Sequence, residues 1–286
     1  MRKNGGGIMA YLQLQGRRKL YYEETGSGQP VVFIHGWKAS AKVYAEPSRL
    51  LCAEGNYRCV RYDHCGHMRS DSPDYPVTLQ TLAEDLHSLI TALQLENPIL
   101  VGWSMGGMTV QEYIRRYGSG HLDRVVFVDI GPRSLGGDGW ALGKRGGTYS
   151  TADLEAEYAQ AKADFKAFLH GYYLGSQRGY ARRDPEAQQA IVEERIAGYD
   201  TRVMADLWYA MNLRDHRDVL PAIACPVAVF HAEILPSCTQ AVADYYNTHI
   251  TAPHRVVRFD GCSHALISED PRRFVDELKS FFDFMR

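Results

Sequence analysis

The sequence lacks any apolar run that approaches the roughly 18 residues needed to cross a bilayer. It also lacks a block of lysine and arginine, and its formal net charge is −2. Polar residues interrupt the chain soon after Met1, Arg2 and Lys3, so no apolar export segment is expected. These absences argue against a membrane partner and against nucleic acid, and they leave a small neutral molecule as the default substrate.

Cysteine patterns that hold metals are absent as well. The six cysteines include no Cys-x-x-Cys pair and no histidine spacing of the kind that a zinc site uses. We therefore expect free thiols, a cytoplasmic protein, no metal and no cofactor. The oligomeric state stays open between a monomer and a homodimer. The cysteines are Cys52, Cys59, Cys65, Cys225, Cys238 and Cys262.

What the sequence does contain is a regular alternation of strands and helices. The chain has 286 residues, 45% of them apolar, which fits one sizeable domain with an insertion. Short all-apolar runs alternate with helical periodicity, as in the helix expected over 79–93. Such strands are typical of a mostly parallel sheet covered on both faces, which predicts an α/β fold. The strands are expected near 11–15, 19–24, 31–34, 57–62, 99–101, 124–130, 226–230 and 254–259.

The stretch from 133 to 220 breaks this alternation. It lacks buried-strand runs and predicts helices over roughly 151–174, 185–198 and 201–213. We therefore divide the chain into a core domain, residues 1–132 and 221–286, and a helical cap, residues 133–220, inserted after the sixth strand. The cap is rich in aromatic residues, which suit a pocket for an apolar or aromatic ligand.

The most informative motif is Gly102-Trp103-Ser104-Met105-Gly106, where a predicted strand turns into a helix over 105–117. Such a sharp bend holds a serine in a strained, exposed conformation, and small residues two positions before and after it avoid a clash. The bend aims the hydroxyl at the carboxyl edge of the sheet. Ser104 is therefore the candidate nucleophile, and the amide of Met105 is a candidate oxyanion donor.

The order of motifs resembles the α/β-hydrolase family over nearly the whole chain. The resemblance implies an eight-stranded, mostly parallel sheet, with the helical cap inserted after strand 6 and lying over the serine. The matching residues are His35-Gly36-Trp37, Asp63-x-x-Gly66-His67, Arg69-Ser70, the serine motif extended by Gly107, Val128-Asp129, Gly261-x-x-His264 and Glu269-Asp270-Pro271.

A serine hydroxyl needs a base within hydrogen-bond reach and an acid that orients the base. His264 is the candidate base because it lies in the loop that leaves the last strand. Most relatives place the acid after the seventh strand in a Gly-x-x-Asp pattern, but this chain has Ile234 at that position. Asp129 is preferred because a carboxylate at the end of a buried strand needs a partner. Glu233 is the alternative acid.

The loop after the third strand supplies the second candidate oxyanion donor, the amide of Trp37. The indole of Trp37 is also expected in the pocket wall. The other residues expected to contact substrate are Trp103, Trp140, Tyr172 and Trp208. The histidines expected to be structural are His35, His67, His231 and His254.

These residues predict a serine hydrolase that cleaves an ester or lactone of a small apolar or aromatic substrate through an acyl-enzyme on Ser104. A perhydrolase or haloperoxidase would use the same three side chains. The chain also resembles cofactor-independent dioxygenases of 3-hydroxy-4-quinolones in its Gly-Trp motif and in the acid after the sixth strand. Trp103 and Met105, however, flank its serine where those enzymes have histidines. A non-catalytic ligand receptor on the same scaffold is a further alternative.

Overall fold

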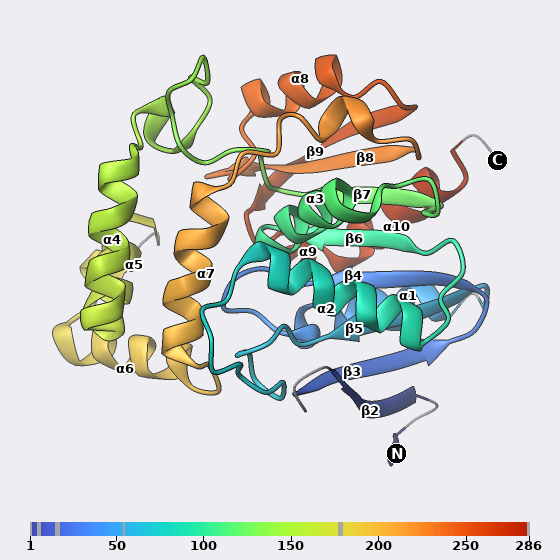
Figure 1. Cartoon of the computed structure of the whole chain (residues 1–286), viewed down its shortest axis with the longest axis horizontal. Helices are drawn as coiled ribbons and strands as arrows, with labels where there is room; N and C mark the ends of the chain where they lie inside the picture. The colour runs from blue at the N-terminus through green and yellow to red at the C-terminus, as the bar shows by residue number, and fades with distance from the viewer. Residues whose placement is uncertain (1, 5–6, 15–17, 54, 177–179, 285–286) are drawn as a thin grey trace.

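A computed structural model describes residues 2–4, 7–14, 18–53, 55–176 and 180–284 of the chain. In these ranges the backbone forms one twisted sheet with helices on both faces, as Figure 1 shows. The predicted α/β class is confirmed. None of the described helices combines the length and the apolarity that a membrane crossing requires.

The strands of the sheet are β1 Arg2–Asn4, β2 Gly7–Gln13, β3 Lys19–Gly26, β4 Gln29–Ile34, β5 Tyr57–Tyr62, β6 Ile99–Trp103, β7 Arg124–Val128, β8 Val227–Ile234 and β9 His254–Ser263. Their order across the sheet is β1-β2-β3-β5-β4-β6-β7-β8-β9. From β5 to β9 all neighbours are parallel, whereas β1, β2 and β3 add antiparallel strands at one edge. The carboxyl ends of the parallel strands therefore meet at one edge of the sheet.

Within the described ranges the sheet has nine strands, one more than the eight predicted. The additional strand is β1, which pairs antiparallel with β2 and places Arg2 opposite Met9. Its residues are arginine, lysine and asparagine, so no apolar alternation reveals it in the sequence. This edge lies far from the strands that carry the candidate site.

Each face of the sheet has its own apolar cluster. The covering helices are α1 Ala45–Cys52, α2 Leu79–Ala92, α3 Met105–Tyr117, α8 Gln240–His249, α9 Leu266–Glu269 and α10 Pro271–Phe282. In β4, Val32 and Ile34 join the cluster under α2, α3 and α8, whereas Val31 and Phe33 join the cluster under α1 and α10. Burial on both faces explains why the central strands read as continuous apolar runs.

The residues between β7 and β8 form helices that stand beside one end of the sheet (Figure 1). We call residues 133–220 the helical insert; its α-helices are α4 Thr151–Ala163, α5 Phe165–Ser176, α6 Pro185–Ile196 and α7 Thr201–Leu213. The helix expected over 151–174 is instead divided into α4 and α5. Asp164 is extended there (φ −150°, ψ 96°), and its carboxylate accepts a hydrogen bond from the amide of Ala167 (3.0 Å), which caps α5.

Candidate active site

Ser104 occupies the bend between β6 and α3. Its backbone lies outside the usual regions for a side chain of this type (φ 54°, ψ −122°), and its amide donates to the carbonyl of Val128 (2.9 Å). A Cβ on Gly102 would lie 2.5 Å from the carbonyl oxygen of Gly106. A Cβ on Gly106 would lie 2.1 Å from the carbonyl oxygen of Ile34. Only glycine fits at both positions, so the motif fixes the half-buried position of the serine at the bend.

The loops after β7 and β9 bring a carboxylate to the histidine. The Nδ1 atom of His264 lies 2.5 Å from Oδ2 of Asp129, which is fully buried. Asp129 also accepts hydrogen bonds from three backbone amides: Ala232 (3.1 Å), Ser237 (2.9 Å) and Cys238 (3.2 Å). The carboxylate therefore accepts hydrogen bonds from four donors.

The surroundings of Asp129 keep it ionised. Burial by itself raises the pKa of this carboxyl, but the hydrogen bond and charge of His264 and the amides of Ser237 and Ala232 act in the opposite direction. The net result is a pKa below the usual value for aspartate. An ionised Asp129 fixes the proton of His264 on Nδ1, and this leaves Nε2 free to accept a proton.

Glu233, the alternative acid, is placed elsewhere. It lies in the exposed end of β8, and its carboxylate accepts a hydrogen bond from the amide of Gly261 (2.8 Å). This contact holds the turn before His264 without reaching the imidazole. The structure therefore brings His264 together with Asp129 and not with Glu233.

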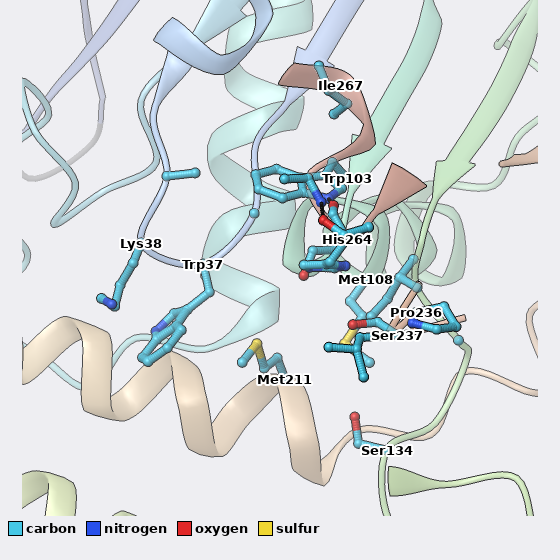
Figure 2. A pocket seen from close by; sticks show the side chains of 18 of the residues that line it. Trp37, Lys38, Trp103, Met108, Ser134, Met211, Pro236, Ser237, His264 and Ile267 are labelled. Atoms are coloured by element: carbon cyan, nitrogen blue, oxygen red, sulfur yellow. Dashed lines mark hydrogen bonds between the residues drawn. The ribbon is translucent and has the colours of Figure 1, made fainter. Parts of the chain in front are cut away.

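Trp103 fixes the loop that carries His264. Its indole Nε1 donates to the backbone carbonyl of His264 (2.9 Å), and the two ring centroids are 5.3 Å apart. Figure 2 shows the two side chains next to each other. Ser104 and His264 line the same cavity, although among the described residues no hydrogen bond joins the serine hydroxyl to the imidazole. Catalytic contacts of this kind often tighten only when substrate binds.

The cavity has a volume of about 1550 Å³ and lies between the sheet edge and the helical insert. Trp37 sits in its wall, where the indole packs against Trp208 (4.9 Å between centroids) and Tyr172 (5.9 Å). The Trp37 Nε1 donates to the carbonyl of Met204 in α7 (2.9 Å), which ties the core loop to the insert. Trp37, Trp103, Tyr172 and Trp208 all line the cavity, and their contact with a substrate stays a prediction.

The expectation for Trp140 is corrected by the structure. This residue is buried and does not line the cavity in the described part of the chain. Its indole donates to the carbonyl of Arg133 (3.2 Å), and its ring meets Tyr245 edge to face (4.7 Å). A buried indole N–H needs an acceptor, which the carbonyl of Arg133 supplies. The ring of Trp140 thus packs the insert against α8.

The two candidate oxyanion donors are the amides of Met105 and Trp37. Met105 is the first residue of α3, where backbone N–H groups have no partner within the helix. A Cβ on Gly36 would lie 3.1 Å from the Cβ of Ser104, so the Gly36–Trp37 turn rests against the serine. Both amides therefore stay the candidate oxyanion donors.

A trio of buried histidines lies beneath this turn. The rings of His35 and His64 are 4.4 Å apart and those of His35 and His67 are 5.0 Å apart. The Nε2 of His35 accepts from the amide of His64 (3.0 Å), so its proton sits on Nδ1, which contacts the carbonyl of Gly36 (2.8 Å). Burial lowers the pKa of His35 to about 4 and that of His67 to about 3. These imidazoles are neutral and pack the loop.

The sequence analysis missed two features of the site. The amides of Ser237 and Cys238 hold Asp129, yet only their folded position reveals this role. Lys38 also lines the cavity, with its backbone in the left-handed region (φ 52°). No motif in the sequence points to either feature.

A family model described as "Alpha/beta hydrolase family" matches residues 31–277. The chain belongs to the α/β-hydrolase family. It is 27% identical over 273 residues to a non-heme chloroperoxidase of Streptomyces lividans, covering 92% of this chain and 95% of that protein. It is 26% identical over 233 residues to 3-oxoadipate enol-lactonase 1 of Acinetobacter baylyi, covering 82% and 81%.

Solved structures of this family agree with the fold. An esterase from Exiguobacterium antarcticum superposes with a TM-score of 0.80 at 25% identity, covering 96% of this chain and 99% of that chain. Esterases and lactonases thus stand among the relatives of this α/β-hydrolase. The predicted enzyme class, an α/β-hydrolase-fold carboxylic ester hydrolase, is confirmed at the level of the class.

Proposed function

We propose that this protein hydrolyses an ester or lactone of a small substrate through an acyl-enzyme on Ser104. The observation that carries the proposal is the position of His264, between a buried carboxylate and a cavity that the serine also lines. A base held by an ionised acid, next to a strained serine, is the arrangement that nucleophilic catalysis of acyl transfer requires. The names of the relatives support the same reaction class.

The reaction proceeds in two halves. Nε2 of His264 takes the proton from Oγ of Ser104 while Oγ bonds to the carbonyl carbon of the substrate. The amides of Met105 and Trp37 stabilise the oxyanion that forms. The carbon–oxygen bond of the ester then breaks, and His264 gives its proton to the departing alkoxide. In a lactone this alcohol stays attached to the acyl chain.

Water completes the cycle. His264 takes a proton from water, whose oxygen bonds to the acyl carbon, and the bond to Ser104 breaks as the serine regains a proton. Asp129 stabilises the positive charge on His264 in both halves, because its lowered pKa keeps it ionised. The aromatic wall formed by Trp37, Tyr172 and Trp208 suits an apolar or aromatic part of the substrate.

Peroxide-dependent chemistry is a second candidate, favoured by the relative from Streptomyces lividans that is named a non-heme chloroperoxidase. In this reaction hydrogen peroxide would replace water as the nucleophile that attacks the acyl-enzyme and would release a peracid. The same residues serve both reactions. Oxidation of monochlorodimedone with acetate, bromide and peroxide present, measured beside ester hydrolysis, distinguishes the two. Oxygen uptake with a 3-hydroxy-4-quinolone tests the dioxygenase alternative.

The location of the reaction is inferred from the thiols. All six cysteines are free, and five of them are buried. Free thiols suit a reducing compartment, which supports a cytoplasmic enzyme.

Labelling of the serine is the decisive experiment. A fluorophosphonate probe should modify Ser104, identified by peptide mass spectrometry, and turnover of p-nitrophenyl acetate should stop in Ser104→Ala. Ser134→Ala is the matched control, because Ser134 lines the same cavity and has no assigned chemistry. This control should keep both labelling and turnover. Full esterase activity in Ser104→Ala would refute the proposal.

A further inference from the structure

The side chains around the cavity carry an unbalanced charge. The basic residues that line it are Lys38, Lys42, Arg133, Lys144, Arg145 and Arg195, whereas Glu46 is the one carboxylate among its described lining residues. The whole chain has a formal net charge of −2. Positive charge is therefore concentrated at this surface. A cavity lined by one sign of charge attracts ligands of the opposite sign.

Two of the arginines are neutralised by neighbours outside the cavity. Arg133 forms ion pairs with Asp138 (2.7 Å) and Asp215 (2.6 Å). Arg145 forms an ion pair with Glu157 (2.5 Å). These two cations hold the insert together and leave little charge for a ligand.

Lys144 also has a carboxylate in its surroundings. Its ammonium lies 4.4 Å from the ring centroid of Trp208, and the charge of Glu157 acts on it. The Trp208 indole donates to the same carboxylate (2.9 Å). Lys144 is thus part of a local group that contains its own negative charge.

Lys38 differs because no carboxylate of the described chain lies within ion-pair distance of its ammonium. Nζ donates to the hydroxyl of Tyr173 (2.5 Å) and lies 5.0 Å from the ring centroid of Trp37. Burial, together with the nearby cation Arg195, lowers the pKa of Lys38 to about 7. Lys38 is protonated below this pH and Arg195 at any ordinary pH, so below pH 7 two positive groups line the cavity without a described counter-ion.

The backbone of Lys38 is held in place as well. Its φ of 52° is uncommon for a residue with a side chain, and its carbonyl accepts a hydrogen bond from the hydroxyl of Tyr199 (3.1 Å). Tyr173 and Tyr199 belong to the helical insert, so the insert holds both the ammonium group and the backbone carbonyl of Lys38. A strained, doubly held and unpaired cation indicates a binding role better than a packing role.

We propose that Lys38 and Arg195 form a subsite for an anionic group of the substrate, so that the preferred ester or lactone carries a carboxylate. This inference rests on the proposed function. It replaces the small neutral molecule expected from the sequence with a negatively charged one. Trp37 would contact the apolar part of the substrate between the carboxylate and the reacting carbonyl.

The distance between Ser104 and Lys38 limits how far the carboxylate of the substrate can be from its ester carbonyl. Gly36 rests against Ser104, and Lys38 follows two positions later, so the Cα atoms of Gly36 and Lys38 are at most about 7 Å apart. In Figure 2 the Lys38 ammonium lies on the far side of Trp37 from His264. A carboxylate at the end of a medium-length chain can therefore reach Lys38 while its ester carbonyl lies at Ser104.

The test compares mono-p-nitrophenyl adipate with p-nitrophenyl hexanoate, which have equal acyl chain lengths and differ in the terminal group. Without an anion subsite the polar terminus should lower kcat/KM, because an aromatic wall favours a methyl group. With the subsite we expect kcat/KM for the adipate to exceed that for the hexanoate at least tenfold. A ratio at or below one in the wild-type protein would overturn the proposal.

Substitutions of single basic residues show which of them cause the preference for the adipate ester. Lys38→Gln should bring the adipate-to-hexanoate ratio close to one, mainly through KM, and Lys38→Arg should keep most of the preference. Arg195→Gln, on the exposed side of α6, should lower the ratio several-fold and serves as the test if Lys38→Gln does not fold. Lys42→Gln is the control, because Lys42 is an exposed lysine on the same cavity and its loss changes the net charge equally. A preference that persists in both Lys38→Gln and Arg195→Gln refutes the subsite.

Calorimetry separates this inference from the proposed function. Adipate should bind to Ser104→Ala and should bind at least tenfold more weakly to the Ser104→Ala/Lys38→Gln protein. If no ester is turned over through Ser104 but adipate binding depends on Lys38, the hydrolase proposal fails and the subsite stands. If esters are hydrolysed and adipate binding does not depend on Lys38, the subsite fails and the hydrolase stands.

Discussion

Replacing Asp129 by asparagine tests how the carboxylate controls His264. The aspartate accepts from four donors, which are the Nδ1–H of His264 and the amides of Ala232, Ser237 and Cys238. An asparagine has only one carbonyl oxygen. Its amide group must therefore point at two of these donors in either orientation.

Both orientations of the asparagine are costly. If the NH₂ group occupies the position of Oδ2, it faces His264 and favours the tautomer with the proton on Nε2, which cannot accept a proton from Ser104. If it occupies the position of Oδ1, the amides of Ala232 and Cys238 are left without an acceptor. A buried donor without a partner costs about 1–3 kcal/mol.

We therefore expect two measurable losses in Asp129→Asn. The loss of the negative charge and of the correct tautomer should lower kcat for p-nitrophenyl acetate about 10³- to 10⁴-fold, which corresponds to about 4–5.5 kcal/mol. The unfolding free energy, measured with urea and circular dichroism, should fall by about 1–3 kcal/mol. KM should change much less than kcat.

Glu233→Gln is the matched control, because it makes the same carboxylate-to-amide change in the other candidate acid. Glu233 is exposed and contacts only the amide of Gly261 among the hydrogen bonds described. Its kcat should stay within about threefold of the wild-type value. A large loss in Glu233→Gln together with a small loss in Asp129→Asn would contradict the assignment.

Three further predictions concern the surroundings of the site. Burial lowers the pKa of His35 from 6.5 to about 4, so the free energy of unfolding should be constant above pH 6.5 and fall by roughly 3 kcal/mol as the pH drops towards 4. Urea unfolding across this range should show the fall, and a flat profile would count against it. Gly106→Ala should abolish soluble expression or lower the melting temperature by more than about 10 °C, because its Cβ would lie 2.1 Å from the carbonyl oxygen of Ile34; normal melting would contradict this. Trp103→Phe removes the hydrogen bond to the His264 carbonyl and should lower kcat about tenfold with little change in KM; steady-state kinetics check this, and an unchanged kcat would show that the loop is held without it.

The sequence predicted the elements that depend on local pattern. The apolar run of β4 reveals a strand because Val31 and Val32 are buried on opposite faces. The glycines around Ser104 reveal the bend because the close contacts there exclude any side chain. These signals come from residues that are close together in the sequence, so a single sequence is enough to reveal them.

The sequence favoured Asp129 over Glu233 but did not eliminate Glu233. Asp129 and Glu233 end neighbouring strands, β7 and β8, so both reach the same edge of the sheet. The difference comes from backbone amides at 237 and 238, which approach Asp129 from a loop more than a hundred residues away. Long-range contacts of this kind leave no periodic signal. The same reason explains the error at Trp140, whose partner Tyr245 lies in α8.

Lys38 carries no signal for a similar reason. A lysine after Gly-Trp reads as an ordinary exposed residue, and its left-handed backbone is visible only once the chain is folded. That no described carboxylate pairs with Lys38 depends on all the elements packed around it, and these come together only in the folded chain. The formal net charge of the whole chain is −2, so it gives no sign of the positive charge that is concentrated at the cavity.

Two of the hydrogen bonds between the loop at residues 37–38 and the insert have a consequence for protein engineering. The indole of Trp37 is fastened to α7, and the carbonyl of Lys38 is fastened to Tyr199 just before α7. Exchanging the insert to admit larger substrates would therefore also disturb the turn beside Ser104. At this contact, the range of substrates accepted and the speed of the chemical step cannot be redesigned independently.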